Sequence, residues 1–344
     1  MNTFAPSQVA AIPAQMRAIA IDGGAGPPEA LSLALRTTPS PGPGEVLIRV
    51  VAAGVNFADQ AQRQGAYPPP PGSSAILGLE VSGIVAALGE GVRYPWVGDR
   101  VCALLSGGGY AEYVTVDARH VLPVAAGLDL VLAGAAPETV FTVYANVFDN
   151  GRLMAGETLL VHGATSGVGV TAIALAKAAE ARVITTSRGA VKAAQARALG
   201  ADLAIDTSQE DFLEVVRVAG GADVILDMVG GDYFQKNLEA LNPDGRLCQI
   251  AFLAGAEPTL NLQQLLLKRL SILGSALRNR SADDKARLTR GIEAEVWPWF
   301  QTGQLQIHVD RVFPLHEAAA AHRYLANSNH LGKIVLQVAE AVAD

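Results

Sequence analysis

The amino-acid sequence predicts an α/β protein in which a doubly wound parallel sheet is inserted into a mostly antiparallel β domain. Between residues 157 and 275, short apolar runs alternate with helix-forming segments, which is typical of parallel strands joined by crossovers. The first 135 residues contain short β-rich runs interrupted by Gly and Pro, with little helical periodicity. The apolar run 332–338 predicts a final strand that returns to the first domain.

These patterns also predict the domain boundaries. We expect the antiparallel domain at residues 1–137, with 1–15 as a loose extension ahead of a first strand that starts at Met16. The parallel-sheet domain is expected at 138–300, and residues 301–344 would return to the antiparallel domain.

Turn-forming residues mark where strands of the first domain begin and end. Residues 41–44 precede a strand expected at 45–51, and the four consecutive prolines in 67–72 predict a stiff loop. Tight turns are expected at 98–100 and 106–109, where Gly is concentrated.

The parallel sheet is expected to contain six apolar strands, at 157–162, 182–186, 203–206, 223–227, 245–250 and 270–275. Helices are expected between them at 170–179, 190–199 and 209–218. After the last strand, Ser281 is placed to cap a further helix, whose apolar face would consist of Leu288, Ile292, Val296 and Phe300.

Composition limits the class of protein. With 50% hydrophobic and 17% charged residues, the 344-residue chain has globular composition, and its net charge of −7 argues against binding to nucleic acid or anionic membranes. No apolar run approaches the roughly 20 residues that cross a bilayer. Cys102 and Cys248 lie in apolar runs and are expected to be buried free thiols, which fits a cytoplasmic protein.

The segment Val161–Gly169 joins an apolar strand to an alanine-rich helix through a turn of small residues. Helix N-termini favour anions, because their unpaired N–H groups and the helix dipole carry partial positive charge. Glycines at 163, 167 and 169 let the backbone approach a ligand without an intervening Cβ. The pattern indicates a pyrophosphate site, although the same glycines would also serve to end a strand and admit close packing.

The next strand ends where a βαβ unit places the adenine ribose of a dinucleotide. An NAD site usually carries Asp or Glu there, whereas this chain has Ser187, Arg188 and Lys192 and no carboxylate. Arg and Lys make charge-assisted hydrogen bonds to phosphate, so the sequence predicts NADPH in preference to NADH. The alternative interpretation of Arg188 and Lys192 is a solvated helix start.

Several short blocks resemble the zinc-independent quinone oxidoreductases of the medium-chain dehydrogenase/reductase superfamily, the zeta-crystallin-like group. The blocks are Gly54–Asp59 with Gln62–Pro69, Leu77–Gly83, Gly98–Val101, His162–Gly169 and Leu331–Leu336. The resemblance implies a GroES-like substrate domain, a Rossmann domain that binds NADPH, and a homodimer or a dimer of dimers.

The resemblance also implies roles for individual residues. Those matching the pyrophosphate site are Gly163, Ala164, Ser166, Gly167, Val168 and Gly169, and those facing the 2′-phosphate are Ser187, Arg188 and Lys192. Further matches to cofactor-binding positions are Thr142, Phe252, Leu253, Leu277, Arg278 and Asn327. Asn56 and Tyr67 match polar residues that line the substrate cleft and are the candidate catalytic residues, and Asn56 is also expected to contact the cofactor.

Zinc-dependent alcohol dehydrogenases share this implied architecture, but the residues that would bind zinc are missing from this chain. Where those enzymes carry Gly-His-Glu, this chain has Gly78-Leu79-Glu80, and leucine cannot bind zinc. The six histidines do not fall at metal-ligand spacing, and two cysteines cannot form a four-cysteine site. We therefore expect a metal-independent enzyme.

The sequence and the resemblance together predict NADPH-dependent hydride transfer to a quinone. A hydroxyl such as that of Tyr67 would stabilise a developing oxyanion, although Tyr67 could instead pack on the proline loop, and Asp59 could be structural. An enoyl or alkenal reductase is the alternative enzyme. A non-catalytic, crystallin-like or RNA-binding protein is the alternative from another class, and net acidity argues against RNA.

Overall fold

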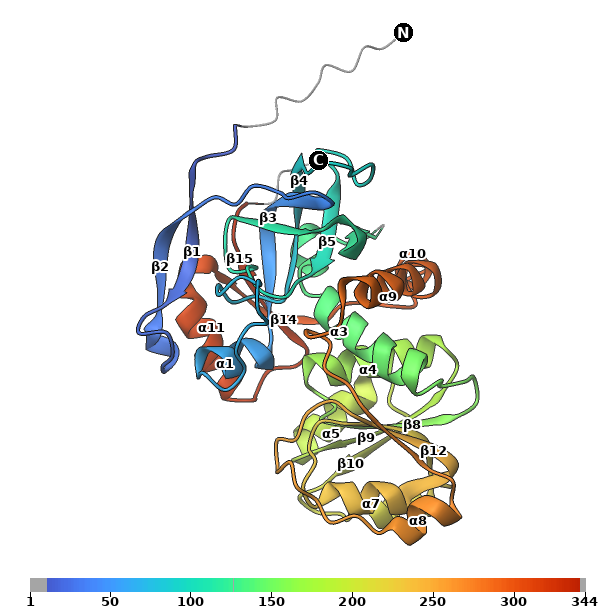
Figure 1. Ribbon diagram of the computed structural model, residues 1–344. Helices are drawn as coiled ribbons and strands as arrows, with labels where there is room; N and C mark the ends of the chain where they lie inside the picture. Colours follow the sequence, from blue (N-terminus) through green and yellow to red (C-terminus); the bar gives the residue numbers. More distant parts are fainter. Residues whose placement is uncertain (1–10, 126, 341–344) are drawn as a thin grey trace. The chain divides into compact units, whose positions relative to one another are not determined.

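The computed structural model describes residues 11–125 and 127–340. The chain forms two compact units (Figure 1). The second unit consists of Glu138–Asp310 and Asn329–Lys333, and the first unit contains the rest of the described chain. The chain thus leaves the second unit at Asp310, whereas the sequence analysis places this boundary at 300. Residues 1–10 of the expected extension lie outside the described residues.

The first unit begins with a two-stranded antiparallel sheet and continues into a larger one. Its elements up to residue 137 are β1 (Gln15–Ile21), η1 (Pro28–Ala30), β2 (Leu31–Thr37), β3 (Glu45–Val55), α1 (Phe57–Arg63), β4 (Glu80–Leu88), β5 (Arg100–Leu104), β6 (Tyr113–Asp117), η2 (Ala118–His120), β7 (Val121–Pro123) and α2 (Leu130–Ala133). The elements towards the C-terminus are β14 (Val309–Pro314), η4 (Leu315–Glu317), α11 (Ala318–Ala326) and β15 (Lys333–Gln337).

The seven-stranded sheet has the order β14-β15-β3-β4-β5-β7, with β6 also paired to β3. Strand β3 is its centre, because it pairs antiparallel with β4, β6 and β15. The pairing of Ile334 with Val55 brings the C-terminal strand to the N-terminal half of the chain, which confirms the expected return. A hydrophobic core that includes Val46, Ile48 and Val50 packs against this sheet.

The second unit contains a doubly wound parallel sheet, as expected. Its elements are α3 (Pro137–Val143), the π-helix η3 (Tyr144–Asn150), β8 (Thr158–His162), α4 (Gly167–Ala178), β9 (Arg182–Ser187), α5 (Ala190–Ala198), β10 (Leu203–Asp206), α6 (Phe212–Val218), β11 (Ala222–Asp227), α7 (Tyr233–Ala240), β12 (Leu241–Gln249), α8 (Leu262–Leu267), β13 (Ser271–Gly274), α9 (Ala282–Glu295) and α10 (Trp297–Gln301).

All six strands of this sheet are parallel, and their order is β10-β9-β8-β11-β12-β13. The order reverses between β8 and β11, so the carboxyl end of β8 lies at the switch point where such sheets bind ligands. Figure 1 shows α4 on one face of the sheet and α7 and α8 on the other. The apolar residues of β8, β9, β11 and β12 are buried between these helical layers, as both faces of a parallel sheet require.

The prediction of a single helix after Ser281 is wrong. Ser281 does cap α9 by accepting a hydrogen bond from the N–H of Asp284, but α9 ends at Glu295 and α10 starts at Trp297. Pro298 lies in the first turn of α10, where its missing N–H costs nothing, whereas inside one continuous helix its ring would clash with a carbonyl. The four apolar residues named for this face are nevertheless all buried.

No helix among the described residues is long and apolar enough to cross a membrane.

Candidate functional site

The turn between β8 and α4 is held together by its own polar atoms. The Ser166 hydroxyl caps α4 by accepting a hydrogen bond from the N–H of Gly169 (3.0 Å), and it donates to the Gly163 carbonyl (2.8 Å). The N–H groups of Gly163 and Ala164 donate to the Thr186 carbonyl near the end of β9 (3.0 and 3.1 Å). Its role as the N-cap residue of α4 therefore explains why a serine stands in this glycine-rich turn.

Glycine is present at positions 163, 167 and 169 of this turn for different structural reasons. Gly163 has φ +80°, a conformation that favours glycine. A Cβ at Gly169 would overlap the carbonyl oxygen of Gly163, so the turn closes only without a side chain there. A Cβ at Gly167 would come within 2.6 Å of the Cδ of Lys333, whose side chain is buried. The close-packing interpretation thus accounts for Gly169, while Gly167 and Val168 begin the helix and are half-buried.

A segment from the far end of the chain lies against the turn, and the sequence analysis did not foresee it. The Gly332 N–H donates to the Thr165 carbonyl (2.9 Å), and Gly332 forms a parallel bridge with Ser166. His330 is half-buried, and its Nδ1 has no hydrogen-bond partner among the described residues. Burial lowers the pKa of His330; the Asp310 carboxylate opposes this shift, and the positive charges of Lys192 and Lys333 add to it.

A buried polar network lies at the ends of β8, β9 and β11. His162 contacts the Thr186 hydroxyl through Nδ1 and the Asn237 carboxamide oxygen through Nε2, both at 2.8 Å. Asn237 donates in turn to Asp227 (3.0 Å), which accepts the N–H of Val229 (2.6 Å). Because Asn237 uses its amide nitrogen for Asp227, its oxygen faces Nε2, which therefore carries the imidazole proton. Burial lowers the pKa of His162 against the attraction of Asp227, so the network holds a neutral imidazole.

The end of β9 presents the residues expected at the adenine ribose. Ser187 is buried, and its hydroxyl oxygen has no hydrogen-bond partner among the described residues. Arg188 is exposed, and Lys192 is half-buried in the first turn of α5. Between them, Gly189 has φ +99° and donates its N–H to Asp206 (2.7 Å). The structure therefore brings these three residues and the β8–α4 turn to neighbouring strand ends of one sheet.

The other second-unit residues predicted for the cofactor lie in three separate segments. Thr142 lies in the last turn of α3, and its carbonyl accepts a hydrogen bond from the side chain of Asn146 in η3 (2.8 Å). Phe252 and Leu253 follow β12 and are exposed. Leu277 and Arg278 follow β13 and are buried.

A salt-bridged helix supports the segment after β13. The buried Lys285 of α9 donates from Nζ to the Arg278 carbonyl (2.8 Å). Arg280 bonds Asp284 (2.6 Å) and the Ser275 hydroxyl (3.1 Å). Residues 275–280 are therefore anchored to α9 rather than left as an unsupported loop. Burial lowers the pKa of Lys285, opposed by the Glu138 carboxylate.

The remaining predicted site residues, Asn56, Tyr67 and Asn327, belong to the first unit. Asn56 caps α1; its N–H donates to Asp59 and its carboxamide donates to Glu80, each at 2.9 Å. Tyr67 is half-buried at the start of the proline loop, and Asn327 is the exposed C-cap of α11. Of these three predicted residues, Asn56 has its side chain oriented by a buried carboxylate, that of Glu80.

Asp59 belongs to a buried cluster that sequence reasoning only partly identified. It accepts hydrogen bonds from the Gly78 N–H (2.9 Å) and the Tyr110 hydroxyl (3.3 Å), so its structural interpretation is confirmed. Tyr110 also meets Nε2 of His322 (3.2 Å), and Arg63 donates from Nε to Nδ1 of the same ring (3.3 Å). Burial lowers the pKa of His322 to about 3 and raises that of Tyr110, so both are neutral at physiological pH.

The positions that would carry zinc ligands have other roles here. Leu79 is buried, and Glu80 is buried against Asn56. Within residues 11–125 and 127–340, no group of three or more His, Cys, Asp or Glu side chains is arranged to hold a metal ion. Cys102 and Cys248 are buried free thiols, as expected, and burial raises the pKa of Cys248 to about 12.

A GroES-like sheet together with a doubly wound parallel sheet and a dinucleotide-type turn defines a dehydrogenase. Residues 42–126 match the alcohol dehydrogenase GroES-like domain, and residues 167–291 match the zinc-binding dehydrogenase domain. The chain belongs to the medium-chain dehydrogenase/reductase superfamily of oxidoreductases. Its resemblance to the quinone oxidoreductases of that superfamily is also confirmed.

Among curated relatives, a 2-haloacrylate reductase from a Burkholderia species is 33% identical over 86% of this chain and 92% of its own length. The human synaptic vesicle membrane protein VAT-1 homolog is 30% identical over 87% of this chain and 80% of its own length. A mycocerosic acid synthase-like polyketide synthase of Mycobacterium tuberculosis is 33% identical, but the chain spans only 14% of its length.

Two solved structures are similar throughout. Mycobacterial Rv1454c, complexed with NADPH, is 30% identical, with a TM-score of 0.83 over 94% of this chain and 100% of its own. A quinone oxidoreductase of Pseudomonas syringae is also 30% identical, with a TM-score of 0.83 over the same shares.

Proposed function

We propose that this protein is a metal-independent NADPH:quinone oxidoreductase, which transfers hydride to a quinone or a related electron-poor conjugated carbonyl. The observation that carries the proposal is the pairing of a glycine-rich, Ser166-capped helix start with the segment 187–192 at the end of β9, which contains two cations and no Asp or Glu. The similarity to an NADPH complex and to quinone oxidoreductases supports it. Two buried, unpaired thiols agree with the cytoplasmic location that we also propose.

The residues around the turn fit a dinucleotide. The first N–H groups of α4 would bind the pyrophosphate, because the helix dipole favours an anion at the helix N-terminus. At the end of β9, Arg188 and Lys192 would hold the 2′-phosphate by charge-assisted hydrogen bonds, and the unpartnered hydroxyl of Ser187 would supply another donor. When bound, NADPH supplies the hydride.

In the first unit, Asn56 and Tyr67 are the proposed polar contacts of the acceptor. The Glu80 carboxylate orients the Asn56 amide, and the Tyr67 hydroxyl would donate to the oxygen on which negative charge develops. Leucine at position 79 leaves no side chain to bind a polarising metal there. A quinone suits this site, because hydride addition yields a delocalised hydroquinone anion that needs little stabilisation.

Reduction of a conjugated carbon–carbon double bond is the second candidate function, and the 2-haloacrylate reductase similarity favours it. The test is NADPH oxidation with 1,2-naphthoquinone, a 2-alkenal and a 2-haloacrylate, with product identification. We expect the quinone to give the highest kcat/KM, and dialysis against a chelator to leave the rate unchanged. Preference for an alkenal or haloacrylate would establish the second function, and chelator-sensitive activity would contradict metal independence.

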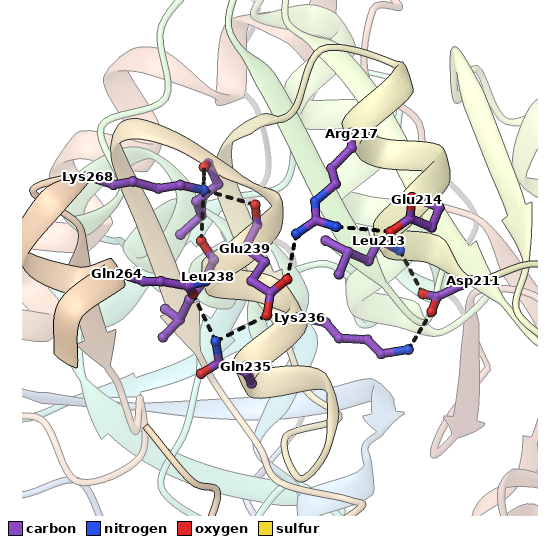
Figure 2. Close-up of polar contacts among 11 residues, drawn as sticks. Asp211, Leu213, Glu214, Arg217, Gln235, Lys236, Leu238, Glu239, Gln264 and Lys268 are labelled. Atoms are coloured by element: carbon purple, nitrogen blue, oxygen red, sulfur yellow. Dashed lines mark hydrogen bonds and ion pairs between the residues drawn. The ribbon is translucent and has the colours of Figure 1, made fainter. Parts of the chain in front are cut away.

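We also propose that the enzyme is a homodimer that pairs through β13 and α8. Strand β13 is the last in the sheet order, and Ile272 on it is exposed together with Leu262, Leu266 and Leu267 of α8. Figure 2 shows how α8 is anchored: Gln264 meets Gln235 (2.8 Å), and Lys268 donates to the carbonyls of Leu238 (3.3 Å) and Glu239 (2.9 Å) in α7. An ordered helix with exposed leucines fits an interface.

Light scattering on a sizing column tests the dimer. We expect Leu266→Glu to yield monomers, because a charge would be buried at the interface. The control is Leu35→Glu, at an exposed leucine of β2 in the first unit. A wild-type monomer, or a Leu266→Glu dimer, would contradict the proposed interface.

A further inference from the structure

We propose that Asp206 is a positioning residue for NADPH selectivity: its carboxylate holds the Arg188–Gly189 peptide so that the segment after β9 can receive the 2′-phosphate. The inference rests on the proposed NADPH function and assigns part of its specificity to a residue on the neighbouring strand. Asp206 is the last residue of β10.

Strand pairing brings Asp206 to the relevant place. Strands β9 and β10 are parallel, and Asp206 is in register with Ser187. Beyond that pair the segments that follow β9 and β10 stay together, because the Thr207 N–H donates to the Ser187 carbonyl (2.9 Å). A side chain at position 206 therefore lies beside the segment that replaces the usual ribose-binding carboxylate.

The contacts of Asp206 are directed at one oxygen. Oδ1 accepts hydrogen bonds from the Gly189 N–H (2.7 Å), the Ser208 N–H (3.0 Å) and the Ser208 hydroxyl (2.7 Å). The Gly189 N–H belongs to the peptide that follows Arg188, so this bond orients the peptide plane that ends the cationic segment. Gly189 has φ +99°, a conformation that glycine adopts readily, and it is the N-cap of α5 without a side-chain capping bond.

The negative charge of Asp206 opposes the binding of a phosphate beside it. The hydrogen bonds from Ser208 and Gly189 lower the pKa of Asp206, so a carboxylate is present at neutral pH. A carboxylate repels a phosphate, and this repulsion alone would disfavour NADPH. Asp206 therefore contributes to selectivity only if holding the turn outweighs the repulsion, and these two effects can be separated by substitution.

Asp206→Asn removes the charge but keeps an oxygen that can accept from Gly189, whereas Asp206→Ala removes both. Affinities for 2′,5′-ADP and 5′-AMP, measured by calorimetry, isolate the 2′-phosphate without any hydride transfer. We expect Asp206→Ala to weaken 2′,5′-ADP about tenfold, the effect of losing one hydrogen bond to a charged group, with 5′-AMP unchanged. Asp206→Asn should bind 2′,5′-ADP at least as tightly as the wild type.

The matched control is Asp244→Ala, which removes an exposed carboxylate paired with Arg269 (2.6 Å) elsewhere in the same unit. Thermal unfolding of each variant verifies that it is folded. The inference is overturned if Asp206→Ala binds 2′,5′-ADP as tightly as the wild type, or if it weakens both nucleotides equally. If the wild type does not distinguish the two nucleotides, the NADPH proposal itself fails and this inference with it.

Discussion

The dinucleotide-type turn of the second unit and the Asp59 cluster of the first unit are built on different principles. The turn spans residues 163–169, and its bonds are made by backbone groups and one serine hydroxyl. The cluster joins residues as far apart as Arg63 and His322, and all of its side chains are buried. A contiguous turn is sensitive to steric change, whereas a buried polar cluster is sensitive to the loss of any one partner.

The comparison also separates binding from scaffolding. Backbone donors at a helix start remain available to an external anion, which suits the turn for a ligand. In the cluster, the donors and acceptors of Asp59, Tyr110 and His322 already meet one another, so it holds α1, the Gly78 turn and α11 together. Four predictions test this distinction.

The largest effect is expected for Gly169→Val. Its side chain would overlap the Gly163 carbonyl, which the backbone can relieve only by opening the turn, so we expect a loss of about 3–5 kcal/mol in the free energy of unfolding. Chemical denaturation measures it. Gly167→Ala is the matched variant: its Cβ meets a lysine side chain rather than the backbone, so it should lose less stability than Gly169→Val and should lose NADPH affinity. An unaffected stability for Gly169→Val would contradict the steric account.

A slightly smaller loss of stability is expected for Asp59→Ala in the first unit. The N–H groups of Asn56 and Gly78 and the Tyr110 hydroxyl would lose a buried acceptor, which costs about 2–4 kcal/mol. Denaturant unfolding checks the value, and Asp22→Ala, at a surface carboxylate bonded to Ser32, serves as the control. If both variants were equally stable, the cluster would not be a scaffold.

For the ligand-binding side of the comparison, we expect Arg188→Ala with Lys192→Ala to weaken NADPH about 10- to 100-fold, while NADH affinity changes little. The reason is the loss of two charge-assisted contacts to the 2′-phosphate. Cofactor fluorescence measures both affinities. An equal loss of affinity for NADPH and NADH would show that these residues support the fold of α5 and do not bind the 2′-phosphate.

The smallest effect concerns pH. His322 has a folded-state pKa of about 3 against an ordinary 6.5, so the unfolded chain binds an extra proton between these values. The contribution of neutral His322 to the free energy of unfolding is fully present above pH 6.5. As the pH falls below 6.5, the free energy of unfolding decreases by up to about 1.4 kcal/mol per pH unit. Denaturation at pH 7 and pH 5 should show this loss, and His322→Gln should reduce it, whereas exchanging the exposed His316 should not.

Much of the second unit could be predicted from local sequence. Each strand of the parallel sheet is a continuous apolar run, because both of its faces are buried, and the turn and its helix are adjacent in the chain. The break between α9 and α10 was missed although Pro298 signals it, since the apolar spacing continues through the break. The contact of Gly332 with Thr165 could not be predicted, because nothing near either residue specifies a partner so distant in the chain.

By itself, the sequence determined the parallel sheet, the glycine-rich turn, the cationic end of β9 and the absence of a histidine at position 79, because each depends on neighbouring residues. Only the tertiary structure decided that Asp206 meets Gly189, that Glu80 orients Asn56, and that Arg63 reaches His322. These contacts depend on strand register and chain return, which bring together polar groups whose burial is tolerable only when they find one another.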